Sequence, residues 1–164
     1  MSETRSVSAT GKWRIRISRN DKLSRETRRL FTVSVADSLI GGGSTLEEAV
    51  NNAKATITKA FSEVNIELIE GLMKAATENV NFSVYEEDKN RYFSVQKTAS
   101  GITVVMTWQD MERPVTFQPP KGRKIRKEDY ACVQARMNDF MASTRDSYYN
   151  SIDEIVTAWN NFNK

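Results

Sequence analysis

Apolar and polar residues alternate along two stretches near the start of the chain, the pattern of a β-strand with one buried face. The stretch 12–18 places tryptophan and isoleucine on one side and lysine, arginine and serine on the other. The stretch 31–35 repeats the alternation, with phenylalanine and valine set against threonine and serine. The charged segment 19–28 reads as a long loop between them, so these residues predict a hairpin with a basic outer face.

A long helix is predicted after this hairpin. Residues 37–43 form a turn that ends in three glycines, and the run 44–47 (Ser-Thr-Leu-Glu) matches a capping box. In such a box the serine hydroxyl accepts a hydrogen bond from the backbone N–H of the glutamate. Apolar residues then recur at three- and four-residue spacing through residues 46–72. This spacing predicts one amphipathic helix, bent near Asn65 or Gly71.

The second half of the chain returns to the alternation of strands before it ends in another helix. Strands are predicted around 82–84, at 91–97 and at 102–108, and a short edge strand at 115–117. A wide apolar and aromatic stripe then runs along 127–159 at helical spacing. This last segment predicts a second long amphipathic helix.

Together these elements predict an α+β protein, an antiparallel sheet of hairpins with two long amphipathic helices. The predicted order is β-β-α-β-β-β-(β)-α. Both halves follow one scheme of strand, charged turn, strand and eventual helix, which suggests a diverged internal duplication. The polar residues 1–11 are expected to form a flexible N-terminal arm, and residues 12–164 a single domain.

Composition narrows the function classes. Apolar residues make up 39% of the 164-residue chain and charged residues 27%, as in ordinary globular proteins. There is no histidine and only one cysteine, Cys132, which excludes histidine-based catalysis, disulfides and thiolate metal clusters. Cys132 lies in the apolar stripe of the last helix, where a buried, reduced thiol is expected. With no run of 18 apolar residues and no signal-peptide pattern, we expect a cytoplasmic protein that does not interact with membranes.

No catalytic site, metal site or cofactor is predicted. The acidic groups at 86–88, 110–112 and 153–154 have the character of solvated surface charge, and none shows the contrasting environments that paired acid–base carboxylates need. The glycine run 41–44 lacks the Gly-Lys-Ser/Thr ending of a phosphate-binding loop. The sequence therefore favours a protein that is not an enzyme.

The near balance of 24 basic and 21 acidic residues hides a segregated charge pattern. Nine basic residues and only two acidic ones fall between Arg5 and Arg29, and residues 121–127 contain five cations and no acid. The rest of the chain has ten basic and nineteen acidic residues. Lysine and arginine clusters gain free energy by displacing counterions from phosphates, so a polyanionic partner is indicated.

We therefore expect binding of single-stranded or structured DNA or RNA on a basic sheet face and a basic loop. Cations would follow the phosphates while aromatic side chains stack on the bases. The candidate phosphate contacts are the basic residues of the two clusters: Arg14, Arg16, Arg19, Arg28, Arg29, Lys121, Arg123, Lys124, Arg126 and Lys127. The candidate stacking residues are Tyr92 and Trp108.

A protein-interaction module is the alternative interpretation. Two long helices with broad apolar stripes offer more apolar surface than one sheet covers, and the surplus would pair two copies about a two-fold axis as a homodimer. The basic segments would then dock on an acidic protein surface, such as that of a nucleic-acid-binding protein. Such a module would act as an inhibitor or regulator and needs no catalytic residue.

Two resemblances accompany these interpretations. The strand 31–35, the glycine-rich turn and the helix start at 44–49 (Ser-Thr-Leu-Glu-Glu-Ala) resemble the strand-to-helix stretch of HicB-type antitoxins. The succession of strands and helices is similar to that of single-strand binders of the Whirly and PUR type. The first resemblance covers a short part of the chain and the second is architectural, so no functional residue is assigned from either.

Overall fold

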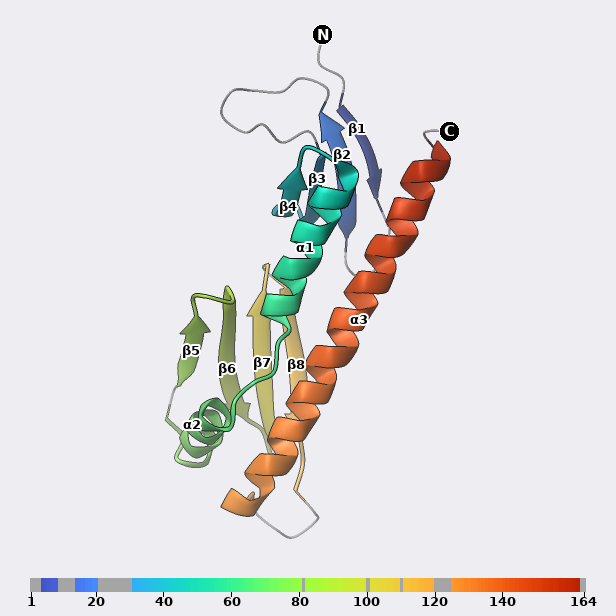
Figure 1. Cartoon of the computed structure of the whole chain (residues 1–164). Coiled ribbons are helices and arrows are strands. Elements are labelled where there is room, and N and C mark those ends of the chain that lie inside the picture. The colour runs from blue at the N-terminus through green and yellow to red at the C-terminus, as the bar shows by residue number, and fades with distance from the viewer. Residues whose placement is uncertain are drawn as a thin grey trace. The chain divides into compact units, whose positions relative to one another are not determined.

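The computed structural model describes residues 4–8, 14–20, 31–80, 82–99, 101–109, 111–119 and 125–162. The chain divides into two compact units, unit 1 (Met1–Phe61 and Thr144–Lys164) and unit 2 (Ser62–Ser143). Each unit contains a four-stranded antiparallel sheet, and helices contribute to both (Figure 1). The predicted α+β class is therefore confirmed. The expectation of a single domain over 12–164 stays a prediction, because compact units that share a helix can still fold as one cooperative domain.

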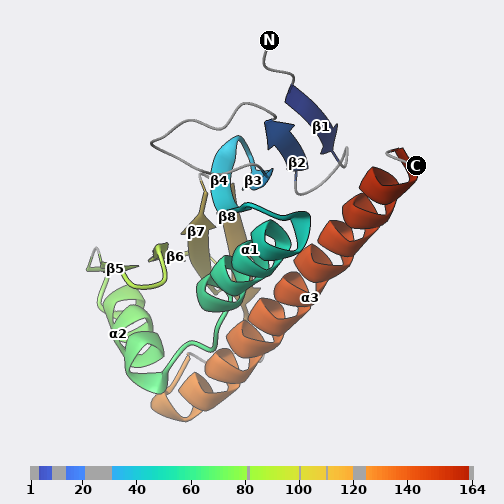
Figure 2. The same cartoon turned by 45° about the horizontal axis from the view of Figure 1, so that its top comes forward.

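Unit 1 is a meander with the strand order β1-β2-β3-β4. Its elements are β1 (Thr4–Ser8), β2 (Ile15–Asn20), β3 (Phe31–Val35), β4 (Ser38–Gly43), α1 (Leu46–Ala60) and the second half of α3 (Tyr130–Phe162). The alternation predicted for β2 and β3 holds, since Ile15, Ile17, Val33 and Val35 are all fully buried. Helix α1 packs against β3 and β4 (Figure 2).

The glycine run forms strand β4, so the prediction of a turn over 37–43 is wrong for most of that segment. The reason is a close approach of α1 to the strand: a Cβ atom on Gly41 would lie 2.4 Å from the backbone nitrogen of Ala53. The side chains of Asn52 and Thr56 also donate hydrogen bonds to backbone carbonyls of β4, at 2.9 and 2.8 Å. Glycine here therefore permits helix–strand packing, and α1 occupies acceptors of an edge strand.

The N-terminal segment contributes strand β1, although the sequence predicted a flexible arm over residues 1–11. Thr4–Ser8 pairs antiparallel with β2, with Ser6 opposite Ser18. Backbone N–H and C=O groups can join a sheet edge whatever their side chains, so a polar segment gives little signal of such a strand. The rest of the predicted arm lies outside the described residues.

Unit 2 is a second meander, with the strand order β5-β6-β7-β8 (Figure 1). Its elements are α2 (Ile66–Thr77), β5 (Ser83–Glu86), β6 (Arg91–Lys97), β7 (Ile102–Trp108), β8 (Met111–Phe117), the 3-10 turn η1 (Lys127–Asp129) and the first half of α3. Phe93, Val104 and Met106 are fully buried on one face of this sheet. Helix α2 packs against β6 and β7.

The long helix predicted over 46–72 is two helices. Helix α1 ends at Ala60 and α2 begins at Ile66, near the predicted bend at Asn65. The Asn65 side chain caps α2 by accepting a hydrogen bond from the backbone N–H of Leu68 at 2.8 Å. The N-cap of α1 lies one residue later than predicted. Thr45 rather than Ser44 caps the helix, because its hydroxyl accepts a hydrogen bond from the backbone N–H of Glu48.

Each unit thus contains a four-stranded meander followed by a helix. The predicted order had only two strands before the first helix, and the structure adds β1 and β4. This extends the likeness between the halves on which the predicted duplication rests. The duplication itself stays a prediction.

Two further expectations from the sequence concern Cys132 and membrane-spanning helices. Cys132 is exposed on α3, whereas burial was expected. Its neighbour Val133, together with Met137 and Met141, forms the buried stripe, and Cys132 lies one residue off that stripe. Within the described part of the chain, none of the helices has the length and apolar character needed to cross a lipid bilayer.

Candidate functional site

The outer face of the unit 1 sheet carries an exposed arginine among hydroxyl groups. Arg16 is exposed on β2 and lies opposite Ser34 of β3, and the next pair on the same face is Ser18 with Thr32. We call these four residues the arginine face. No carboxylate lies on this face of β2, β3 and β4 among the residues that the structure describes. Guanidinium and hydroxyl groups in this arrangement can donate hydrogen bonds to an anion such as phosphate.

Arg14 lies at the turn end of the same sheet. Its side chain is exposed, and its carbonyl accepts a hydrogen bond from the backbone N–H of Ala36 at 3.2 Å. Arg14, Ala36 and Asp37 all have left-handed backbone conformations, with φ of 50°, 50° and 67°. The left-handed pair at 36 and 37 makes the tight turn between β3 and β4, and this turn positions the Arg14 backbone.

Arg19 lies on the other face of the sheet, so the structure does not bring it together with Arg16. It shares the side of β2 that carries Ile15 and Ile17, and it is half-buried. Its guanidinium lies 5.7 Å from the centre of the Phe31 ring, which meets Trp159 edge to face at 6.0 Å. Arg19 was expected in a loop, but β2 extends to Asn20, so the alternation of the strand puts Arg19 on the same side as Ile15 and Ile17.

The second basic cluster is described only in part. Arg126 and Lys127 are exposed at the start of η1, where the Arg126 backbone N–H donates to the Asp129 carboxylate at 2.8 Å. Glu128 and Asp129 follow immediately, so carboxylates adjoin these two cations. The remaining basic candidates lie outside the described residues: Arg28, Arg29, Lys121, Arg123 and Lys124.

Trp108 is a core residue, and its prediction as a base-stacking side chain is wrong. It is 1% exposed and shares the buried side of β7 with Ile102, Val104 and Met106. The alternation along β7 sets Ile102, Val104, Met106 and Trp108 against Thr103, Val105 and Thr107, and the more apolar side is the buried one.

Tyr92 does lie on the open side of the unit 2 sheet, next to a second exposed tyrosine, Tyr85. Tyr85 of β5 lies directly opposite Tyr92 of β6, and the two are 56% and 39% exposed. The Tyr85 hydroxyl donates to the side-chain oxygen of Asn90 at 2.7 Å. We call the two rings and their hydroxyl neighbours the tyrosine face; its members are Tyr85, Tyr92, Ser83, Ser94 and Thr107.

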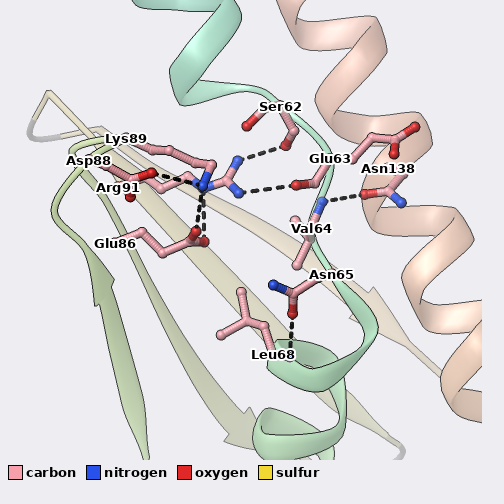
Figure 3. A network of polar contacts seen from close by, with 10 residues as sticks. All are labelled: Ser62, Glu63, Val64, Asn65, Leu68, Glu86, Asp88, Lys89, Arg91 and Asn138. Carbon is pink, nitrogen blue, oxygen red and sulfur yellow. Dashed lines mark hydrogen bonds and ion pairs between the residues drawn. The ribbon is translucent and has the colours of Figure 1, made fainter.

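A buried arginine cluster beside these strands has a structural role. Arg91, 1% exposed, donates to a Glu86 carboxylate oxygen at 3.1 Å and to the carbonyls of Ser62 and Glu63 at 2.7 and 3.2 Å (Figure 3). It thereby holds the connector between α1 and α2 against the β5–β6 hairpin. Lys89 shares the Glu86 carboxylate.

The Lys89 amine is the titratable group of this cluster with a shifted pKa. Its hydrogen bonds to Glu86 and Asp88 raise its pKa above the ordinary 10.5, because both carboxylates favour the charged amine. Lys89 therefore stays protonated at neutral pH. The charges of the cluster are matched within it, which argues against a catalytic role.

Comparisons with known proteins add no assignment. No family model, no curated protein and no solved structure matches this chain. Among the described residues there is also no group of three or more side chains suited to hold a metal ion. Two separate candidate surfaces therefore remain, the arginine face of unit 1 and the tyrosine face of unit 2.

Proposed function

We propose that the protein binds nucleic acid, with the arginine face of unit 1 contacting the phosphate backbone. The observation that supports this most directly is the exposed Arg16 among hydroxyls on a sheet face without a described carboxylate. Arg14 adds a second exposed guanidinium next to the same sheet. Arginine and hydroxyl side chains are typical donors to phosphate oxygens.

The surrounding sequence strengthens this proposal. Between Arg5 and Arg29 basic residues outnumber acidic ones nine to two, and Arg14 and Arg16 lie inside that segment. Contacts of this kind recognise the backbone and carry no base information. The proposed binding is accordingly independent of sequence and sensitive to salt.

Fluorescence anisotropy with labelled oligonucleotides over a series of salt concentrations tests this function. Replacing both arginines (Arg14→Gln with Arg16→Gln) is expected to weaken binding and to reduce the slope of log K against log salt by about 0.7 for each lost contact to a single strand. Each arginine is also replaced singly. The control for the single variants is Lys74→Gln, which makes the same charge change at an exposed lysine on α2.

The expected result is a weaker, less salt-dependent interaction for each arginine variant and wild-type behaviour for Lys74→Gln. Absence of binding by the wild-type protein at low salt refutes the function. In that case the alternative, a protein that regulates another protein, predicts that a pull-down from nuclease-treated lysate recovers one stoichiometric protein partner.

A further inference from the structure

The tyrosine face of unit 2 presents two neighbouring aromatic rings on an open sheet surface. We propose that this face is a platform on which two successive unpaired bases of a single-stranded nucleic acid stack. The inference rests on the nucleic-acid binding proposed above and adds a preference for single strands.

The geometry of the pair suits stacking. Tyr85 and Tyr92 are directly opposite on adjacent antiparallel strands, a relation that places Cβ atoms about 5 Å apart. On the opposite side of β6, Phe93 is fully buried, so the core of unit 2 supports the strand that carries Tyr92. The hydrogen bond from the Tyr85 hydroxyl to Asn90 restrains one ring before any ligand binds. Four-stranded sheets that hold RNA use paired strand aromatics in this way.

The chemistry around the rings fits bases better than a protein surface. A stable protein interface has an extended apolar core. On this side of the sheet, four of the exposed side chains other than the two tyrosines are polar and one, Pro114, is apolar. The polar ones are Ser83, Gln96, Glu112 and Thr116. The hydroxyls of Ser83, Ser94 and Thr107 can donate to or accept from the edges of bases.

A carboxylate on this side of the sheet favours one orientation of the strand. The row of paired residues that contains Tyr92 continues through Thr107 to Glu112 on β8. With neighbouring strands about 4.8 Å apart, the Glu112 position is two strands, or about 10 Å, from Tyr92. Salt weakens the repulsion between that carboxylate and phosphates at this distance, but it still disfavours the backbone relative to the bases at the rings.

Binding of a single strand and of a duplex of the same base composition, measured by anisotropy, tests the platform. The double variant Tyr85→Ile with Tyr92→Ile keeps residues that favour strands but removes the rings. We expect it to lose about tenfold or more in affinity for the single strand and to bind the duplex as the wild type does. The matched control, Tyr85→Phe with Tyr92→Phe, keeps the rings and is expected to retain single-strand affinity.

Equal single-strand affinity of the isoleucine and wild-type proteins overturns the platform while leaving the proposed phosphate binding intact. No binding of either oligonucleotide by the wild type overturns both. Photocrosslinking of the wild-type protein to a 5-iodouracil single strand keeps the test decisive if the isoleucine variant fails to fold. Crosslinks mapped to Tyr85 or Tyr92 support the platform, and crosslinks confined to other residues overturn it.

Discussion

Replacing Arg91 by methionine tests the interpretation that this residue clamps the connector between α1 and α2. Methionine has a similar length and keeps apolar contact with the surroundings, but it removes the charge and all hydrogen-bond donors. The change removes the donor of three hydrogen bonds, one to a Glu86 carboxylate oxygen and two to the carbonyls of Ser62 and Glu63. The contact of the guanidinium with the Phe93 ring, 5.2 Å from its centre, is lost as well.

The magnitude follows from what each of these acceptors loses and keeps. Removing one partner of a buried ion pair costs about 3–5 kcal/mol when the remaining charge has no other partner. Here Glu86 keeps Lys89 at 3.1 Å and has an 18% exposed side chain. Ser62 is half-buried and Glu63 is exposed, so water can reach their surroundings. We therefore expect a loss near the lower end, about 3 kcal/mol.

Urea unfolding followed by far-UV circular dichroism and tryptophan fluorescence measures this loss. In a thermal melt, about 3 kcal/mol corresponds to a decrease in Tm of about 10 °C for a chain of this size. Arg91→Lys restores the charge but replaces the planar fork by one ammonium, so about half of the loss is expected. Arg145→Met is the matched control, because the ion pair of Arg145 with Asp146 is long, at 3.9 Å.

Two results would refute the reasoning. If Arg91→Met and Arg145→Met both unfold within about 0.5 kcal/mol of the wild type, solvent fully replaces the clamp. If Arg91→Lys is as stable as the wild type while Arg91→Met is not, one ammonium is enough, and the forked hydrogen bonds to the Ser62 and Glu63 carbonyls contribute nothing.

Three smaller changes test other features. Ala36→Gly should stabilise the protein by about 0.5–1 kcal/mol, because alanine is strained at a φ of 50°; an unchanged or lower Tm contradicts this. Gly41→Ala should destabilise it by about 3 kcal/mol in urea, because the new methyl would overlap the backbone of Ala53; a loss below about 1 kcal/mol would show that α1 shifts freely. Lys89 has a raised pKa in the folded state, so its stabilising contribution is complete below pH 10.5 and is lost as the pH rises through the folded-state pKa. The difference in unfolding free energy between wild type and Lys89→Met should therefore shrink in alkaline urea titrations, and a difference that persists unchanged at high pH would contradict the assignment.

The α1–α2 break shows why helix existence was predictable and helix length was not. The apolar spacing over 46–72 continues across the break, and the segment 61–65 contains no proline or glycine to signal an end. Partners distant in sequence stabilise the break. Arg91 donates hydrogen bonds to two carbonyls of the connector, and the Asn138 side chain accepts one from the backbone N–H of Val64 at 2.7 Å. A local pattern carries no information on such partners.

The candidate residues also differ in how far the local sequence pattern predicts their positions. The alternation along β2 was enough to place Arg16 on the outside, because the isoleucines on the other side require burial. The same reasoning favours Tyr92 over Trp108, because the Tyr92 side of β6 also carries Ser94 and Gln96, whereas Trp108 shares its side of β7 with apolar residues. Selecting Trp108 as a stacking residue disregarded that pattern. The pairing of Tyr85 with Tyr92 was not predicted, because it depends on the register of the β5–β6 hairpin.

The sequence by itself determined the α+β class, the strand alternation and the segregation of charge, because each depends on residues near one another in the chain. The tertiary structure decided which side of each sheet its helices cover. That choice buries Trp108 and leaves Tyr85 and Tyr92 exposed. The physical reason is that covering a face depends on the combined apolar area and shape of elements distant in sequence, and this is established only when the chain folds.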